Sequence, residues 1–259
     1  MSKLAITGKG GVGKTTLASV LARLHAADGH KVLAIDADPD ANLGAALGIS
    51  NEELKRITPI AQLEELIHER TGSKPGTVGG MFKLNPQVDD ITDRFSISKD
   101  GIRLLVLGTV KKGGSGCICP ESALLKSLLT HLLLRRDEMV ILDMEAGIEH
   151  LGRGTAAAVD AFITVVEPGM RSLETAQAVR KLAEDIGIKQ CFVVGNKIEH
   201  DTDRQFITDN LHDFTVLGFI SQNPKIGEAD RKGISPYDLD PKVVSEVKAI
   251  REQLAAFSR

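Results

Sequence analysis

The glycine-rich stretch GKGGVGKTT at residues 8–16 lies directly between two segments of different character. Before it, KLAIT (3–7) is a short apolar run of the kind found in strands that are buried on both faces of a sheet. After it, TTLASVLARLHAADG (15–29) has the periodicity of a helix and ends at a glycine. A strand, a glycine loop and a helix in direct succession favour folds built from β–α units, in which helices cover a parallel sheet.

The rest of the chain repeats this alternation of apolar runs and helical patterns. Six further runs are typical of buried strands, at residues 31–36, 102–108, 139–143, 161–167, 191–196 and 214–220. Helical patterns lie between several of them, at 122–136 with Ser122 as its N-cap and at 171–187. We therefore predict an α/β fold with a mostly parallel β-sheet and helices on both faces, in a single domain over residues 1–259. The glycine- and proline-rich part of residues 71–100 is expected to be an irregular insertion near one edge of the fold.

The composition argues against several classes of protein. A chain of 259 residues can bury a sizeable core without disulfides, so its three cysteines are not needed for that purpose. We expect a cytoplasmic protein, because the sequence opens without a signal peptide and no apolar run approaches the roughly 20 residues of a membrane span. A net charge of −3, one tyrosine and no tryptophan argue against a nucleic-acid partner.

The loop at 8–16 carries a phosphate-binding pattern, because Gly8, Gly13, Lys14 and Thr15 fit G-x-x-x-x-G-K-[ST] in full. In such a loop the backbone N–H groups and the helix N-terminus converge on phosphate oxygens, the lysine adds a positive charge and the hydroxyl holds Mg²⁺. The alternative is a glycine turn that only joins a strand to a helix. The predicted nucleotide-binding residues are Gly10, Gly11, Val12, Gly13, Lys14, Thr15 and Thr16, with Lys14 also catalytic and Thr15 a magnesium ligand.

A second lysine makes this pattern more specific. Lys9 opens KGGVGKT (9–15), which resembles the deviant Walker A motif of the dimeric ATPases related to MinD, ParA and the nitrogenase iron protein. The resemblance implies ATP and ADP as ligands, a homodimer, and a catalytic Lys9 that reaches the nucleotide of the other subunit. A cation at the transferred phosphoryl group would stabilise the transition state as an arginine finger does. The alternative is a solvated loop lysine.

An acidic segment follows the second predicted strand. DADPDANL (36–43) places Asp36, Asp38 and Asp40 at the carboxyl end of that strand, where sheets of this type bind ligands. The alternation allows one or two of these carboxylates to face Mg²⁺ and water. In the resembled family this segment is switch I, so Asp38 would position the attacking water and contribute to the magnesium site. The alternative is a helix N-terminus with acidic caps.

The run MVILD (139–143) ends in Asp143, which we interpret as a Walker B carboxylate that holds Mg²⁺ through water. Gly147, Gly152 and Gly154 would leave the following loop free to respond to a γ-phosphate. The opening DMEAG departs from the DxPxG-like pattern of the resembled family. The conformation of this loop is therefore left open, whereas the role of Asp143 is not.

The segment GNKI (195–198) follows the apolar residues CFVV. By similarity to the family, Asn196 and Lys197 would contact the adenine, because one amide can both donate to and accept from a purine edge. The alternative for Asn196 is a turn residue after a strand.

The C-terminal segment 241–257 has the pattern of an amphipathic helix. MinD uses such a helix at membranes, but here Glu246 and Glu252 interrupt the basic residues. We therefore expect the helix to dock on the core and predict no stable membrane association. The apolar face is formed by Val243, Val247, Ile250, Leu254 and Phe257.

Two of the three cysteines lie one residue apart in GGSGCICPE (113–121). In an extended chain Cys117 and Cys119 would point to the same side, and Pro120 favours that geometry. Two thiolates leave a four-coordinate ion half satisfied, whereas two such pairs across the twofold axis of a dimer would form a four-thiolate site for Ni²⁺ or Zn²⁺. The alternative is two incidental buried cysteines. Cys191 falls in a predicted strand and is expected in the core.

KKGGSGCICPE, the preceding GGMFKLNPQVDD and the phosphate loop together resemble the CooC-type maturation ATPases, over nearly the whole chain. The resemblance implies an ATP-dependent nickel-handling dimer that serves carbon monoxide dehydrogenase as its client, with Cys117 and Cys119 as metal ligands. Two hypotheses from other classes stay open: a spatial regulator like MinD or ParA, and an iron–sulfur reductase like the nitrogenase iron protein. Thiolate ligands alone do not decide between Ni²⁺ and Zn²⁺.

Overall fold

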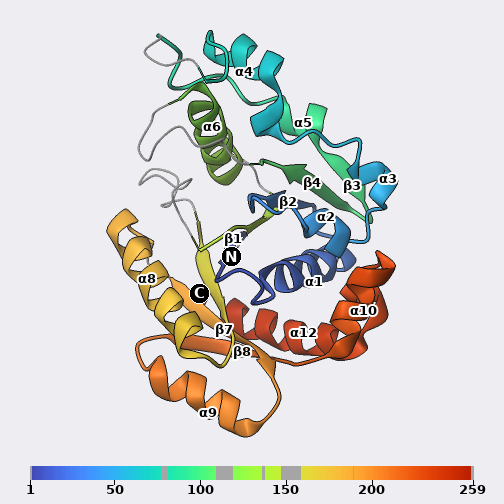
Figure 1. Ribbon diagram of the computed structural model, residues 1–259, viewed down its shortest axis with the longest axis vertical. Coiled ribbons are helices and arrows are strands. Elements are labelled where there is room, and N and C mark those ends of the chain that lie inside the picture. The colour runs from blue at the N-terminus through green and yellow to red at the C-terminus, as the bar shows by residue number, and fades with distance from the viewer. Residues whose placement is uncertain are drawn as a thin grey trace.

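The computed structural model describes residues 2–76, 81–108, 119–135, 138–146, 159–188 and 190–257 (Figure 1). Within these ranges the strands are β1 (Lys3–Thr7), β2 (Val32–Asp36), β3 (Ile97–Lys99), β4 (Ile102–Val106), β5 (Met139–Asp143), β6 (Ala161–Val166), β7 (Cys191–Ile198) and β8 (Thr215–Ser221). They form one eight-stranded sheet in the order β3-β4-β2-β5-β1-β6-β7-β8. β3 runs antiparallel to β4, and all the other neighbours among these strands pair in parallel. The predicted mostly parallel α/β sheet is confirmed.

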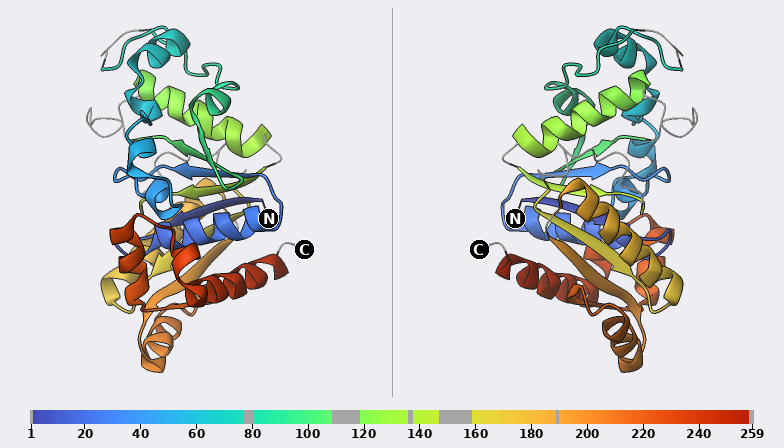
Figure 2. Two further views of the ribbon diagram at one scale, coloured as in Figure 1. Left: turned by 90° about the vertical axis from the view of Figure 1, so that its right-hand side faces the viewer. Right: turned by 90° about the vertical axis from the view of Figure 1, so that its left-hand side faces the viewer.

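Helices cover both faces of this sheet, as predicted. The described helices are α1 (Lys14–Ala27), α2 (Leu43–Ala46), α3 (Asn51–Leu54), α4 (Glu64–Thr71), α5 (Ile91–Phe95), α6 (Pro120–Arg135), α8 (Met170–Ile186), α9 (Asp201–Asn210), α10 (Pro224–Lys232), α11 (Pro236–Leu239) and α12 (Pro241–Ala256), with a 3₁₀ turn, η1, at Ile60–Gln62. α1 and α12 pack on one face, and α6 and α8 on the other (Figures 1 and 2).

The central strand β1 shows why the strand segments are continuous apolar runs. All five of its residues are buried. Leu4 and Ile6 belong to the core cluster under α1 and α12, whereas Ala5 belongs to the cluster under α6. Successive side chains of a strand point to opposite faces, so a strand covered on both sides needs apolar residues at every position.

The region of residues 71–100 contains α5 and β3 and leads to the β3 edge of the sheet (Figure 1). Neither element was predicted, because glycine and proline turns interrupt the apolar pattern of the sequence. One available signal was the pair Asp100–Gly101, which joins β3 to β4 with φ angles of 48° and 79°. An Asp-Gly pair at positive φ is typical of a two-residue hairpin turn.

Two of the predicted boundaries that differ from the structure concern candidate site residues or their neighbours. α6 begins at Pro120, so Ser122 lies inside the helix and is not its N-cap. Proline suits the first helical position because its φ is fixed near the helical value and its missing N–H is not needed there. β7 continues to Ile198, two residues beyond the predicted run 191–196, so Lys197 also belongs to the strand.

The C-terminal helix α12 docks on the core, as predicted, through Val243, Val247, Ile250 and Leu254. Phe257 lies just beyond the helix and is 41% exposed, so it is not part of the buried face; its ring contacts that of Phe192 with 5.1 Å between centroids. In the part of the chain that the structure describes, no helix combines the length and apolar character needed to cross a membrane.

The sheet order brings the predicted functional segments together. β5 lies between β2 and β1, and the β2–β5 register places Asp36 beside Asp143. The backbone N–H of Ala37 donates to the carbonyl of Asp143 at 2.9 Å, which joins the chain after β2 to the end of β5. The glycine loop follows β1, the other neighbour of β5. The candidate site therefore forms at the carboxyl ends of three adjacent parallel strands.

Candidate functional site

The glycine loop between β1 and α1 has a backbone that requires glycine at two positions. Gly8 and Gly13 have φ angles of +148° and +96°. A Cβ atom at Gly8 would lie 2.4 Å from the carbonyl oxygen of Val165, and one at Gly13 would lie 2.1 Å from Nδ2 of Asn196. Both positions are therefore closed to other residues by close packing as well as by φ.

Gly13 is also the N-cap residue of α1, and no side chain caps this helix end. The first backbone N–H groups of a helix have no partner within the helix, and the helix dipole places a partial positive charge there. Gly10 and Gly11 are exposed at the tip of the loop. An uncapped helix N-terminus preceded by an exposed glycine loop is suited to bind phosphate oxygens.

Asp143 and Thr15 form the buried floor of the site. The hydroxyl of Thr15 donates to Oδ2 of Asp143 at 2.7 Å, while Oδ1 of Asp143 is buried without a hydrogen-bond partner. Burial raises the pKa of Asp143 to about 6, and the Thr15 hydrogen bond and the nearby Lys14 charge oppose that rise. A hydroxyl and a carboxylate oxygen are ligands that Mg²⁺ accepts, and an unpartnered buried carboxylate oxygen favours a cation. These residues fit a magnesium ion bound with a nucleotide.

Lys14 and Asp38 lie against each other beside this floor. Nζ of Lys14 is 3.4 Å from Oδ2 of Asp38, and the two side chains are 6% and 12% exposed. The other carboxylate oxygen of Asp38 accepts from the backbone N–H of Asp40 at 3.0 Å, whereas Asp40 itself is exposed. Asp38 thus points into the site and Asp40 lies at its surface.

Asp36 has a different role from the two other carboxylates of this segment. It is completely buried, and its two oxygens accept from the backbone N–H groups of Asp38 at 3.2 Å and of Leu43 at 2.9 Å. Burial raises its pKa to about 7, and the nearby charge of Asp143 adds to the rise. The sequence allowed one or two aspartates to face an ion. The structure shows that Asp36 anchors the 38–43 loop and that Asp38 faces Lys14.

Lys9 lies at the tip of the glycine loop next to Gly10 and is partly buried. Its carbonyl oxygen accepts from the backbone N–H of Val12 at 3.3 Å, which closes the turn of the loop. Its predicted action on a second subunit stays a prediction.

The structure brings Asn196 into the phosphate loop. Its amide Nδ2 donates to the carbonyl oxygen of Val12 at 2.7 Å, and its Oδ1 accepts from the backbone N–H of Lys197 at 2.8 Å. Lys197 in turn forms an ion pair with Glu167 across 2.8 Å. These contacts were not predicted, although Glu167 ends one of the predicted strands. The adenine contact expected for Asn196 and Lys197 stays a prediction.

The predicted pair of cysteines is described only in part. Cys119 is partly buried immediately before α6, with Sγ 3.2 Å from the hydroxyl of Ser122. Cys117 lies outside the described residues, as do the loop glycines Gly147, Gly152 and Gly154. Within the described ranges, no group of three or more His, Cys, Asp or Glu side chains is placed to hold a metal ion.

Cys191 opens β7 and packs against the core cluster under α6, but it is only partly buried, so the prediction of a core position is correct for its packing and too strong for its burial. Burial raises the pKa of its thiol.

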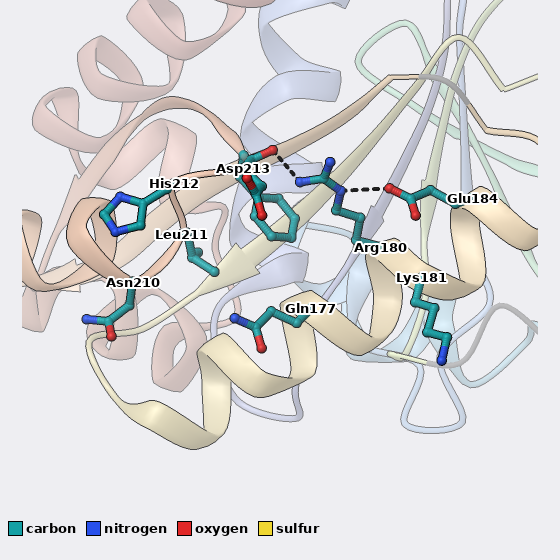
Figure 3. Close-up of a pocket in the computed structure, with 9 residues that line it drawn as sticks. Gln177, Arg180, Lys181, Glu184, Asn210, Leu211, His212 and Asp213 are labelled. Carbon is teal, nitrogen blue, oxygen red and sulfur yellow. Dashed lines mark hydrogen bonds and ion pairs between the residues drawn. The ribbon is translucent and has the colours of Figure 1, made fainter.

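A separate groove of about 680 Å³ lies between α8 and residues 210–214 (Figure 3). Arg180 crosses it, with Nε donating to Glu184 at 2.8 Å, Nη1 donating to the carbonyl of Asp213, and the guanidinium 5.0 Å from the ring centroid of Phe214. The cation is thus engaged within the groove, and none of the predicted site residues lines it.

Comparison with known proteins identifies the family. Residues 3–237 match the family described as the CobQ/CobB/MinD/ParA nucleotide binding domain. The chain belongs to this family. It is 48% identical over 252 residues to the carbon monoxide dehydrogenase accessory protein CooC of Rhodospirillum rubrum, covering 97% of this chain and 95% of CooC. It is 46% identical to an uncharacterised ATP-binding protein of Methanocaldococcus jannaschii, covering 96% and 95% of the two chains.

Solved structures of the MinD/ParA type share the fold. A chain of the MinC–MinD cell division protein complex of Aquifex aeolicus superposes with a TM-score of 0.69 at 24% identity, covering 99% of this chain and 96% of that one. MinD of Pyrococcus horikoshii, solved with Mg-ADP, gives 0.66 at 19% identity and covers 100% and 98%. The resemblance to CooC-type and MinD-type ATPases is confirmed. The protein is a nucleotide-binding ATPase of the MinD/ParA family.

Proposed function

We propose that this ATPase is a dimeric accessory protein of carbon monoxide dehydrogenase, and that it carries a nickel or zinc ion as cargo between its two subunits. The observation that carries the proposal is the similarity to CooC over nearly the full length of both chains. Such coverage extends far beyond the phosphate loop in both chains, so it is not explained by a shared nucleotide-binding motif alone.

In this proposal the phosphate groups of ATP lie in the glycine loop, against the residues from Gly10 to Thr16. Lys14 carries the positive charge at the outer phosphates. Thr15 and Asp143 hold Mg²⁺, which, when bound, neutralises charge that develops on the phosphate oxygens. Support for this assignment is the 2.7 Å contact between the two residues and the unpartnered oxygen of Asp143.

Asp38 is the residue that positions the attacking water and contributes to the magnesium site. Its support is the 3.4 Å contact with Lys14, since a phosphate oxygen bound by Lys14 would lie next to the Asp38 carboxylate. Asp36 is not a competitor for this role, because both of its oxygens already accept backbone N–H groups.

The cargo ion is held by Cys117 and Cys119 of both subunits. Pro120 at the first position of α6 supports the extended geometry that the pair needs, since a residue before proline avoids the helical region. Four thiolates in a symmetric dimer would complete a coordination sphere that one chain leaves half filled.

Dimer formation would link the two sites. Lys9 acts on the nucleotide of the other subunit, so ATP and metal would both favour the same interface. A ligand that binds only the dimer shifts the monomer–dimer equilibrium towards it.

Anaerobic titration of Ni²⁺ or Zn²⁺ against the mass of the dimer tests the proposal. We expect one ion per two chains and a shift towards dimer without nucleotide. Cys117→Ser or Cys119→Ser should abolish high-affinity binding, because a symmetric site loses two thiolates at once, while the matched Cys191→Ser control should bind as the wild type does. One ion per chain, or unchanged affinity in the first two variants, would refute the shared site.

The two other hypotheses predict different results in the same preparation. An iron–sulfur reductase would contain about four iron atoms with sulfide per dimer. A MinD-like regulator that binds membranes through its last helix would need an exposed apolar face there, but four apolar residues of α12 are buried in the core.

A further inference from the structure

The side-chain amide of Asn196 is buried, and both its nitrogen and its oxygen form hydrogen bonds within the protein. It is 4% exposed near the end of β7. Nδ2 donates to the carbonyl oxygen of Val12 at 2.7 Å, and Oδ1 accepts from the backbone N–H of Lys197 at 2.8 Å. One of its two hydrogen bonds therefore reaches the phosphate loop, 184 residues away in the sequence.

The contact fixes the orientation of one peptide group in that loop. In a planar trans peptide the C=O and the following N–H point in opposite directions. Because Asn196 holds the carbonyl of Val12, the N–H of Gly13 in the same peptide group points away from Asn196. A Cβ atom at Gly13 would lie only 2.1 Å from Nδ2 of Asn196, so the amide packs directly against this peptide group.

The amide itself is held in place by the next residue. Lys197 has a φ of +58°, a conformation that residues other than glycine rarely adopt. Its Nζ pairs with Oε2 of Glu167 at 2.8 Å, and the backbone N–H of Glu167 donates to the hydroxyl of Ser172 at 3.1 Å. A side chain fixed in this way can transmit a defined position to the loop that it contacts.

We propose that Asn196 is a positioning residue for the phosphate groups of the nucleotide. It orients the Val12–Gly13 peptide so that the N–H of Gly13 faces the bound phosphates, and it acts through the loop rather than on the base. The proposal concerns the nucleotide site alone, so it stands or falls independently of the client enzyme and of the metal cargo.

Asn196→Asp tests this, because the substitution keeps the size of the side chain and replaces the donor that faces Val12 with an acceptor. The probes are Mg²⁺ with inorganic tripolyphosphate, ATP or GTP. We expect the affinities for tripolyphosphate and ATP to fall by the same factor, on the order of tenfold for the loss of one buried hydrogen bond, with an unchanged ATP-to-GTP preference.

Asn210→Asp is the matched control. Asn210 also donates through Nδ2 to a backbone carbonyl, that of Phe206 at 2.8 Å, but at an exposed position at the end of α9. This variant should bind all three probes as the wild type does.

Two results would overturn the proposal: unchanged affinity for tripolyphosphate in a folded Asn196→Asp protein, or a loss of ATP affinity together with the ATP-to-GTP preference, which would assign the residue to the adenine. If the variant does not fold, the NMR chemical shift of the Asn196 side-chain amide in the wild-type protein provides a second test. Tripolyphosphate alone should shift it as ATP does, whereas a response only to ligands that contain a base would refute the role in positioning phosphate.

Discussion

Asp143→Asn should stabilise the nucleotide-free protein at pH 8 while removing its magnesium-dependent ATPase activity. Asp143 is completely buried, its Oδ1 has no hydrogen-bond partner, and burial raises its pKa from 3.8 to about 6. The folded protein therefore holds a charge that the unfolded chain would hold more easily. An asparagine removes the charge and can still accept the hydrogen bond of Thr15.

The expected gain follows from the shift in pKa. A rise from 3.8 to about 6 corresponds to about 3 kcal/mol at pH 8, where the carboxyl is ionised in both states. The amide NH₂ of the variant would itself lie in a site without an acceptor, which costs about 1 to 2 kcal/mol. We expect a net stabilisation of about 1 to 2 kcal/mol.

The sign of the pH dependence is fixed by the direction of the shift. The folded state binds the proton more tightly than the unfolded state, so wild-type stability falls as pH rises from about 4 through about 6. The advantage of Asp143→Asn should therefore be smaller at pH 5 than at pH 8, by about 1.4 kcal/mol.

Urea denaturation in EDTA at pH 5 and pH 8 measures both quantities. Asp185→Asn, the same substitution at an exposed position of α8, is the control and should change stability by less than about 0.5 kcal/mol at either pH. A variant less stable than wild type at pH 8, or an advantage that does not change between the two pH values, would refute the argument from charge burial. Mg²⁺ with ADP should stabilise the wild type more than Asp143→Asn.

Three further predictions concern single residues. Lys14→Ala should abolish ATP binding. Asp38→Ala should retain ATP binding, because removing the partner 3.4 Å away leaves Lys14 free for phosphate, but its hydrolysis should fall on the order of 10²-fold or more. Nucleotide titration and phosphate release measure these effects, and equal loss of ATP affinity in both variants would contradict the prediction. Mixing Lys9→Ala with Asp38→Ala subunits should restore about a quarter of wild-type activity, since each heterodimer has one complete site if Lys9 acts across the interface; heterodimers without activity would exclude that role. Burial lowers the pKa of His25 to about 4, so the wild type should lose stability as pH falls from 6.5 to 4. His25→Gln should make this loss smaller by about 1 to 2 kcal/mol, after discounting for partial exposure. Thermal unfolding at a series of pH values measures the loss, and an unchanged pH profile in the variant would refute this.

The parts of the fold that sequence predicts well are those in which local pattern and tertiary position agree. β1 and β5 match their predicted ranges to the residue, because central parallel strands are apolar on both faces and end where polar loop residues begin. β3 was missed because a three-residue edge strand with partly exposed residues has no such run. The start of α6 was misplaced because Ser122 is a good N-cap in general, whereas Pro120 is an equally good first residue.

In the candidate site, too, some contacts could be predicted from the sequence and others could not. The contact of Thr15 with Asp143 was foreseeable, since one motif follows β1, the other ends β5, and adjacent parallel strands bring their carboxyl ends together. The contacts of Asn196 with Val12 and of Asp36 with Leu43 were not. They depend on which hydrogen-bonding atom of a polar side chain meets which backbone group. Residue type and spacing do not specify that choice, because several backbone groups lie within reach of each side chain.

The charges of Asp36, Asp38 and Asp143 favour the binding of a cation and lower the stability of the ligand-free fold. The charge of Asp38 raises the pKa of both Asp36 and Asp143, and the charge of Asp143 also raises the pKa of Asp36. Among the described ion pairs, Lys14 is the cation that contacts Asp38. A buried carboxylate without a matched cation lowers the stability of the folded state. In the proposed site, a magnesium–nucleotide complex would bring positive charge to Asp38 and Asp143 and negative charge to Lys14. Part of its binding free energy would therefore be relief of a repulsion that already exists in the free protein, so nucleotide affinity and stability would be linked through Asp38 and Asp143.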